Sequence, residues 1–558
     1  MTCSLKRVCL LWIIVLYLPI TAIADPPVDP TQARISQQLS GLAPKAGGIC
    51  ELEGLPIVAI HVDRNDIFDT SDPNTKAWFY RWANALHIVS KEDFIRSMLL
   101  FKEGDPYSAS RAAEGARILR GLGIMNPVNI TAHRVEGGVD VMVETRDQWT
   151  LKAGASLGVS GSNASYRVDF EEENLLGWGK AVSVAYESDV ERNSWSLGYF
   201  DPNVFNSRWR VNLFHATYTD GFHDEVVIDR PFYSLVTPRT WGVSALRQEL
   251  VDHLYSRSES VVEGFHESEL LSIWGGVRLP GSETVTRRVI AGWEHRQNLY
   301  SDWVWEETST PYPQPEDRLI NGPRLSYEQI VDRFIVVEGL RAWAVQEDVS
   351  LGPNFSLTAI ASSPTFGGDR KRLLMAGRGH AANRHGRWLL LGDTWFSGRL
   401  EDGAAHNLVA GLQLGAAQLG IRGWQIRFFV EGSRRLDRDR QLTLGADLGL
   451  RGWDPNYFDG TGRALLNVQW RRLLKKEILG LFSVGIVLFG DAGKTWDPRV
   501  GPDTDGVRFD AGAGLLFDLS HVGRSTLLRI DAAVPDDGTG VTVTISTSTI
   551  FRLPSRWR

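Results

Sequence analysis

From Thr150 to the C-terminus, short segments alternate between apolar and polar residues, and clusters of glycine, asparagine, aspartate and proline separate them. Alternation with a period of two residues is typical of a β-strand that has one apolar and one polar face. The clearest such segments are 151–159, 181–186, 208–218, 388–395, 425–430, 526–534 and 541–551. No helical spacing interrupts the pattern, so it predicts an all-β structure for most of the chain.

Two architectures fit these strands. In the segment 541–551, Val541, Val543 and Ile545 share one face, and threonine and serine residues occupy the other. Such a strand suits a membrane barrel with lipid outside and water inside, and it also suits a soluble sandwich with an apolar core. The 20 tryptophan, 23 phenylalanine and 13 tyrosine residues favour the barrel, because barrels carry aromatic girdles at both membrane interfaces. We therefore predict a transmembrane antiparallel β-barrel over residues 149–558, closed because an open sheet edge in lipid leaves backbone groups unpaired.

The N-terminus indicates export from the cytoplasm. Lys6 and Arg7 precede the apolar run 8–20, and Ala22-Ile23-Ala24 provides a small-x-small cleavage site. This is the layout of a secretory signal peptide, which we predict over residues 1–24. The apolar run is too short to favour a membrane-spanning helix.

The composition and the motifs exclude several classes of site. Cys3 and Cys9 lie in the signal peptide, so Cys50 is the single cysteine that remains, and neither an intramolecular disulfide nor a cysteine-based metal site is possible. The net charge of −7 gives no broad basic surface for nucleic acid. The chain has no Gly-x-Ser-x-Gly elbow, P-loop or zinc-protease helix motif. We therefore expect no enzyme activity, no cofactor, no metal site and no nucleic-acid partner.

The part of the chain before the barrel has a different pattern. Residues 25–54 contain proline, glutamine and glycine without a sustained period, which predicts a flexible leader. Within residues 55–148, a short β-type run is followed by helical spacings of apolar residues and then by two alternating runs, 128–135 and 139–145. This order predicts a small α+β domain.

A long connection rich in glycine, aspartate, proline and asparagine lies between two alternating segments near the end of the chain. It begins with Leu450, Arg451, Gly452 and Trp453 and continues to Gly462. The arginine stands between a glycine and aromatic residues, as if a cation were carried on a loop to a fixed partner. The other interpretation is a solvated hairpin loop with an exposed arginine, because most loops run over the surface.

Six groups of short motifs, in order along the chain, resemble those of the BamA/TamA superfamily of outer-membrane proteins. These are Phe101-x-x-Gly104-Asp105-Pro106-Tyr107, Arg117-x-Leu119-Arg120-x-Leu122-Gly123, Glu173-Asn174-Leu175-Leu176-Gly177-x-Gly179, Tyr199-Phe200-Asp201-Pro202 with Arg230-Pro231-Phe232, Leu450-Arg451-Gly452-Trp453, and Gly490-Asp491-Ala492-Gly493-Lys494-Thr495-Trp496. Each motif is weak alone, and their shared order behind a signal peptide makes the resemblance specific.

The resemblance implies one POTRA-like domain at residues 55–148, followed by a surface-antigen-type barrel of about sixteen strands. In the family the Arg-Gly-aromatic motif lies between the eleventh and twelfth strands, so five strands should follow it. Five alternating runs do follow Arg451, at 463–471, 482–491, 507–518, 526–534 and 541–551. More than eleven precede it, so either some of those are loop hairpins or the barrel has more strands than sixteen.

The resemblance also implies that the loop folds back into the barrel and that Arg451 meets an acidic residue on the inner wall. Asp491 matches the acidic partner of the family. A second carboxylate often lies on the strand after the loop, where this chain has the neutral Gln469. The sequence therefore places a two-carboxylate arrangement in doubt and leaves Asp491 as the main partner.

In function, the resemblance implies an outer-membrane protein assembly, insertion or translocation factor of a Gram-negative-type envelope, with its N-terminal domain in the periplasm. Client strands would pair with free sheet edges by β-augmentation. The expected edges are Val128, Ile130 and Val135 in the N-terminal domain, and the barrel seam between Leu151–Val159 and Val541–Phe551. The expected partners are outer-membrane lipids, unfolded barrel or secreted client proteins, and periplasmic or envelope accessory proteins. The alternative is a passive outer-membrane pore or a lipid-handling barrel.

Overall fold

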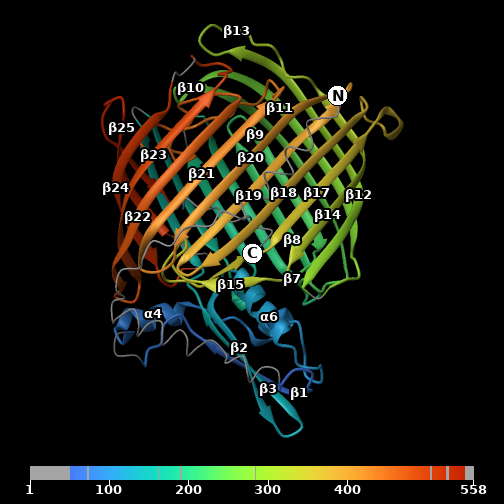
Figure 1. The fold of residues 1–558 in the computed structure, drawn as a ribbon, viewed down its shortest axis with the longest axis vertical. Coiled ribbons are helices and arrows are strands. Elements are labelled where there is room, and N and C mark those ends of the chain that lie inside the picture. The colour runs from blue at the N-terminus through green and yellow to red at the C-terminus, as the bar shows by residue number, and fades with distance from the viewer. Residues whose placement is uncertain are drawn as a thin grey trace.

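The computed structural model describes residues 51–71, 75–160, 163–188, 191–282, 284–502, 506–522 and 527–546. These residues form a small domain at one end and a large closed β-barrel above it, as Figure 1 shows. The predicted signal peptide and most of the predicted leader lie outside the described residues. No helix in the described part is long and apolar enough to cross a membrane.

The N-terminal domain contains three helices and a three-stranded sheet. Its elements are β1 (Ile57–Asn65), α4 (Trp78–Leu86), α5 (Glu92–Met98), α6 (Ala109–Gly121), β2 (Met125–Val135) and β3 (Gly138–Asp147). The strand order is β1-β3-β2, with β1 parallel and β2 antiparallel to β3. Val139, Val141 and Val143 of the central strand are buried because alternate side chains point to one face, where they pack with Phe94 and Leu119.

The barrel is one antiparallel sheet that closes where the last described strand lies beside the first. Its strands are β4 (Leu151–Ser160), β5 (Asn163–Glu172), β6 (Ala181–Ser188), β7 (Asn193–Val204), β8 (Trp209–Tyr218), β9 (Gly221–Arg230), β10 (Arg239–Ser256), β11 (Glu259–Arg278), β12 (Val285–Trp305), β13 (Thr310–Pro311), β14 (Arg318–Val331), β17 (Pro353–Ser362), β18 (Arg372–His385), β19 (Trp388–Glu401), β20 (Ala404–Gln418), β21 (Arg422–Arg434), β22 (Gly462–Ile478), β23 (Phe482–Trp496), β24 (Arg508–Leu519), β25 (Leu527–Pro535) and β26 (Thr542–Ser546). Short 3-10 turns lie at η2 (Leu175–Gly177) and η3 (Pro364–Phe366). The prediction of an antiparallel barrel behind a small α+β domain is confirmed.

The number of strands differs from the prediction. The closed sheet contains 21 described strands, with the two-residue β13 counted, instead of about sixteen. Five of them, β22 to β26, follow the loop that carries Arg451, as predicted, but sixteen precede it instead of eleven. Because β12 also pairs directly with β14, leaving out the two-residue β13 gives fifteen strands before the loop, four more than expected, and added hairpins enlarge an antiparallel barrel two strands at a time. The motifs therefore indicated the order of the elements correctly, and the number of strands before the loop was wrong.

The outer surface of the barrel carries a belt of exposed apolar side chains. Leu271, Ile273, Leu325, Leu357 and Leu488 all point outward from the middle of their strands. On β23 the residues next to Leu488 in sequence, Val487 and Phe489, are buried on the inner face. An apolar outer face is what a lipid-embedded barrel requires.

Two connections enter the barrel from opposite ends. The near loop, residues 332–352, joins β14 to β17 at the end beside the N-terminal domain and contains the hairpin β15 (Phe334–Val337) and β16 (Glu347–Ser350). The far loop, residues 435–461, joins β21 to β22 at the opposite end. Figure 1 shows β15 between the N-terminal domain and the barrel wall.

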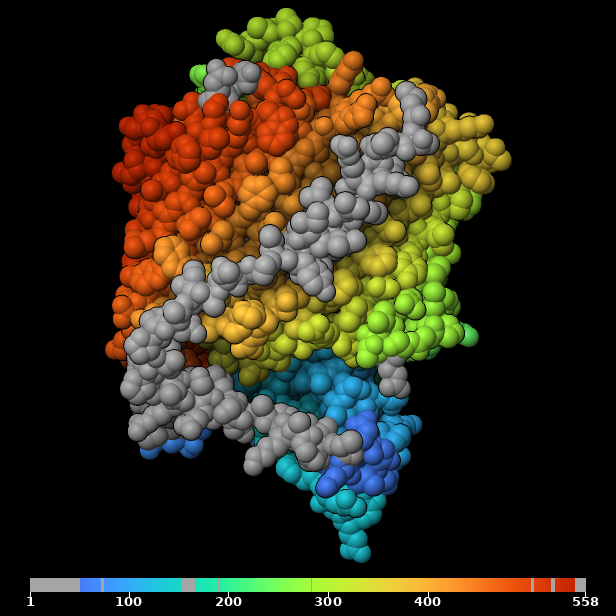
Figure 2. All heavy atoms as spheres, in the orientation of Figure 1, coloured from blue at the N-terminus to red at the C-terminus, as the bar shows by residue number. Residues whose placement is uncertain are grey.

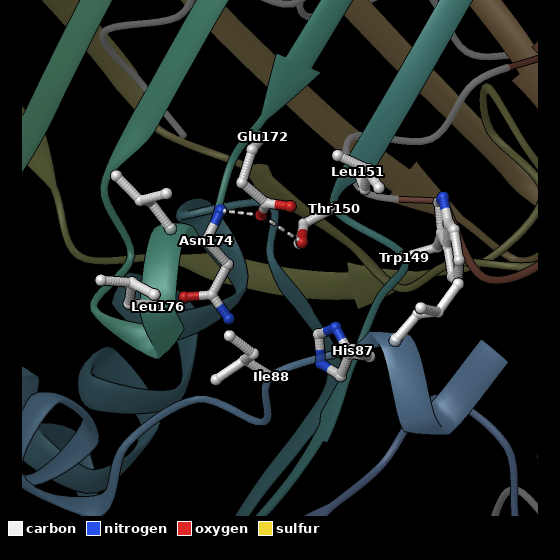
Figure 3. Close-up of a pocket in the computed structure, with 10 residues that line it drawn as sticks. His87, Ile88, Trp149, Thr150, Leu151, Glu172, Asn174 and Leu176 are labelled. Carbon is white, nitrogen blue, oxygen red and sulfur yellow. Dashed lines mark hydrogen bonds between the residues drawn. The ribbon is translucent and has the colours of Figure 1, made fainter. Parts of the chain in front are cut away.

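The N-terminal domain is joined to the barrel by a very short link. Only residues 148–150 separate β3 from β4, and both Gln148 and Thr150 are buried. Beside the link, the Asp147 carboxylate accepts hydrogen bonds from the backbone N–H and the hydroxyl of Ser90, at 2.7 and 2.9 Å. A cavity of about 110 Å³ lies at this junction, as Figure 3 shows, with Glu172 accepting from Thr150 on one side of it.

Candidate functional site in the barrel lumen

The far loop folds inward because its apolar residues find partners on the inner wall. Leu450, Trp453 and Phe458 are buried and pack against Phe429 of β21 and Leu465 of β22. Burying one such side chain contributes about 1.5–3 kcal/mol. Those contacts hold residues 450–458 of the far loop against the inner wall of the barrel.

The inward course of the loop brings Arg451 to Asp491. The guanidinium Nε and Nη2 donate to the two oxygens of the Asp491 carboxylate, both at 2.8 Å. The same guanidinium lies over the ring of Phe489, 3.5 Å from its centroid. Arg451 is 7 % exposed. The structure therefore contradicts the interpretation of Arg451 as an exposed loop cation.

Gly452 is required by the close approach of the loop to the wall. Its backbone N–H donates to the Asp510 carboxylate of β24 at 2.9 Å. A Cβ atom at this position would lie 2.6 Å from the Cβ of Asp510. Any larger residue would therefore push the loop away from the wall and lengthen the neighbouring contacts of Arg451.

Two further carboxylates near Arg451 were missed in the sequence. Asp510 lies directly opposite Asp491 on the neighbouring strand, and Asp531 of β25 lies 3.6 Å from Nη1 of Arg451. Asp531 also accepts from Arg529 at 2.8 Å. Alternation could have placed all three aspartates on the inner face, but strand register, which sets their common height, is not visible in a single sequence.

Gln469 takes part in the site through both ends of its amide. Its carbonyl oxygen accepts from Arg451 and from Arg529, each at 3.3 Å. Its NH₂ group donates to the Gln425 side chain at 2.7 Å. A carboxylate has no such donor at neutral pH, so the amide connects Arg451 to Gln425 in a way that a glutamate could not.

Gln425 leads from the far loop to the near loop. Its NH₂ group donates to the backbone oxygen of Leu340 at 2.6 Å. Arg471 of β22 donates to the backbone oxygens of Leu340 at 2.7 Å and Arg341 at 2.9 Å, and also to that of Gly339. A continuous set of buried hydrogen bonds therefore joins Arg451 of the far loop to Leu340 of the near loop inside the barrel.

The near loop is also attached to the N-terminal domain. Arg120 of α6 donates to both oxygens of Asp348, at 2.9 and 2.7 Å. Asn126 of β2 donates to the backbone oxygen of Gln346 at 3.0 Å. Charge-assisted bidentate pairs of this kind fix orientation as well as position. The near loop thus lies between the N-terminal domain and the lumen network.

The predicted edge residues lie apart from the lumen. Val128, Ile130 and Val135 belong to β2, the outer strand of the N-terminal sheet. Leu151 and Val159 belong to β4, the first strand of the barrel. At the closing end of the sheet, Val541 directly precedes β26, which lies beside β4, and Phe551 lies outside the described residues.

One group of side chains in the described part has the composition of a metal site. His253, Glu263 and Glu306 bring potential ligand atoms within 4.8 Å of one another. Ser260 hydrogen bonds to His253 at 2.8 Å and also to Glu306. The Ser260 hydroxyl thus connects two of the three side chains, His253 and Glu306.

Comparisons with known proteins come from solved structures. No protein-family model matches the chain, and no curated protein matches it. The chain is similar in structure to a BamA from Haemophilus ducreyi lacking POTRA domains 1–3, with 14 % identity, 88 % of this chain and 83 % of that chain covered, and a TM-score of 0.32. It is also similar to CdiB from Acinetobacter baumannii (11 % identity, 88 % and 74 % covered, TM-score 0.41) and to CdiB from Escherichia coli (12 % identity, 94 % and 98 % covered, TM-score 0.41). At these values the similarity carries no argument about function, which has to come from the residues of this chain.

Proposed function

We propose that this protein is an outer-membrane assembly, insertion or translocation factor that captures client strands on its N-terminal sheet and passes them to the barrel seam. The observation that carries the proposal is the free outer edge of β2. Within the described residues, only β3 pairs with β2. An unpaired edge of this length is a template for another strand, which proteins usually cover or shorten unless they use it.

The direction of the backbone groups supports a pairing position for a client strand on β2. The Val128 oxygen faces outward, because it accepts from Arg120 at 3.0 Å. Successive residues of an antiparallel strand direct their N–H and C=O groups to opposite sides. Ile130, Ala132 and Arg134 therefore turn their backbone groups toward the free edge. The β2–β3 hairpin also points away from the barrel, so the edge is accessible (Figure 1).

The short link between the sheet and the barrel supports the second half of the proposal. β3, the partner of β2, is followed after three residues by β4. β4 is one of the two strands that close the barrel. A client paired with the N-terminal sheet would therefore lie close to the seam, where the same kind of strand pairing is available.

The alternative function, a passive pore, is disfavoured by the contents of the lumen. The near loop and the far loop enter from opposite ends and meet the same inner wall at Gln425 and Gln469. A passive pore requires a solvated path between the ends. Under the proposed function, the expected location is the outer membrane with the N-terminal domain in the periplasm, and the expected partners are lipids, unfolded clients and accessory proteins.

The proposal can be tested with full-length protein in liposomes and a urea-unfolded barrel client whose folding is followed by heat-modifiable gel migration. Arg134→Pro removes an outward N–H of the exposed part of β2. Arg134→Ala removes the same side chain and keeps that N–H. We expect the proline variant to slow client folding about tenfold relative to the alanine variant. This corresponds to an activation free energy that is about 1.4 kcal/mol higher. Equal rates for the two variants would contradict the proposal, and solute flux without any effect on client folding would favour the pore.

A further inference from the structure

Helix α4 of the N-terminal domain exposes an apolar stripe to its surroundings. Trp78, Trp82 and Leu86 are 71 %, 59 % and 53 % exposed. Positions four residues apart lie on one side of an α-helix. The opposite side, with Tyr80, packs against Ile67 and Phe68 of the same domain. The stripe is therefore not part of the domain core.

The position of α4 is fixed against the base of the barrel. The Tyr80 hydroxyl donates to the backbone oxygen of Leu479, in the turn between β22 and β23. Phe68, which packs on Tyr80, also contacts the ring of His521 after β24, with centroids 4.9 Å apart. These turns end membrane-facing strands. Figure 1 shows α4 lying crosswise beneath the orange and red strands that carry these turns.

Apolar side chains of the outer barrel surface continue down toward the helix, with the exposed Arg472 among them. Trp424 and Trp470 lie opposite each other on β21 and β22, at the base of the outer face. Leu474 and Leu479 follow them toward α4 and are 56 % and 63 % exposed. Tryptophan is enriched where a membrane protein crosses the boundary between acyl chains and headgroups. The pair therefore marks that boundary just above α4.

Basic residues lie beside the stripe. Lys475 and Lys476 are exposed in the segment that leads to Leu479, and Lys76 and Arg81 are exposed at the helix itself. Tryptophan and leucine on one side, with lysine and arginine next to them, are typical of a helix that lies in the plane of a membrane surface. The positive charges match the phosphate groups of phospholipids.

We propose that α4 is an interfacial membrane helix, whose Trp78, Trp82 and Leu86 insert among the lipids of the leaflet that surrounds the base of the barrel. The occupant of the stripe is the lipid surface itself. The inference requires only that the barrel lies in a bilayer, and it does not depend on the client-handling function.

The test uses the full chain, with its cysteines replaced by serine, in nanodiscs of phosphatidylcholine and phosphatidylglycerol. A bimane label is placed by Trp82→Cys, by Leu86→Cys, or by Val58→Cys on β1. Val58 is an exposed apolar residue of the same domain, away from the barrel turns, and serves as the matched control. Lipids brominated on their acyl chains quench a label inside the membrane, and iodide quenches a label in water.

We expect brominated lipid to quench the labels at 82 and 86 about twofold more than the label at 58, because interfacial helices bury their apolar face below the headgroups. Iodide should show the reverse order. In a background with Trp78→Glu, the label at 82 should lose its lipid quenching while heat-modifiable migration is kept. Equal lipid quenching at the three positions would overturn the proposal. Protection of position 82 from both quenchers would also overturn it, because the stripe would then be covered by protein, such as residues 1–50 or a second copy.

Discussion

The far loop and the near loop enter the lumen from opposite ends, and the barrel wall binds them through different sets of atoms. The far loop offers a charged side chain, that of Arg451, which donates hydrogen bonds to both carboxylate oxygens of Asp491. The near loop offers backbone atoms: Arg471 donates to the carbonyls of residues 339–341, and Asp518 accepts from the N–H groups of Trp343 and Ala344. The wall also binds backbone atoms of the far loop, at Gly449 and Gly452, so the far loop differs from the near loop in its added ion pair with the wall.

The ion pair between the far loop and the wall predicts the largest loss of stability. Arg451→Ala or Asp491→Ala should each lower the free energy of unfolding by about 3–5 kcal/mol, because each leaves a buried charge without its partner. The double variant should be no worse than either single variant, since both remove one interaction. Unfolding in urea, followed by the change in gel migration, measures the effect. Arg440→Ala, an exposed residue of the same loop, is the control. Additive losses would contradict the pairing.

The second largest effect is expected for the near loop. Arg471→Ala should lower the free energy of unfolding by about 2–3 kcal/mol, because it removes the donor to the carbonyls of Gly339 and Arg341, whereas Leu340 keeps Gln425 as a donor. Ala344→Ser changes a side chain and keeps the N–H that Asp518 binds, so it should cost less than about 0.5 kcal/mol. Hydrogen exchange of residues 339–347 would separate the two variants. A large effect of Ala344→Ser would show that the side chains of the near loop matter as much as its backbone.

A third experiment asks whether the two loops act on each other. A double-mutant cycle of Arg451→Ala and Arg471→Ala should show a coupling energy of about 0.5–1.5 kcal/mol, because both arginines join the network through Gln469 and Gln425. In a Gln469→Glu background the coupling should disappear, since the carboxylate keeps the acceptor for Arg451 but has no donor for Gln425. Gln425→Met, which breaks the same connection from the other side, should have the same consequence. Coupling that survives both changes would mean that the loops communicate by another route.

The smallest effect concerns the attachment of the N-terminal domain near the start of the near loop. Glu114 of α6 accepts from the Leu235 N–H at 2.6 Å, and its pKa is raised because burial desolvates the carboxylate. A raised folded-state pKa means that folding favours the protonated form, so the folded state should become more stable as the pH falls through that pKa toward the ordinary value for glutamate, even though the Leu235 hydrogen bond itself favours the ionised form. Hydrogen exchange of residues 109–121, corrected for intrinsic rates, should show more protection at pH 5 than at pH 7. Glu114→Gln keeps the acceptor and should remove the pH dependence; an unchanged dependence would assign it to another group.

The same contrast explains what the sequence could predict. Arg451 and Asp491 are side chains in recognisable motifs, so their contact could be expected before the structure was known. The near loop left no such signal, because every sequence has the same N–H and C=O groups that Arg471 and Asp518 bind. Gln469 was interpreted as a missing carboxylate, since its partner Gln425 lies 44 residues away in sequence and their adjacency depends on strand register. The number of strands was wrong for a related reason: alternation marks each strand but does not limit how many hairpins a barrel includes.

The three-residue link at 148–150 has a mechanical consequence. An extended chain of three residues spans only about 10 Å, and both Gln148 and Thr150 are buried, so the link has little slack. The hairpin β2–β3 and the strand β4 are therefore expected to move together. The hydrogen bond from the Trp149 N–H to the His521 carbonyl holds the link between them against the barrel. A displacement of the hairpin tip would therefore reach the first strand of the barrel almost undiminished, because the link between them cannot lengthen.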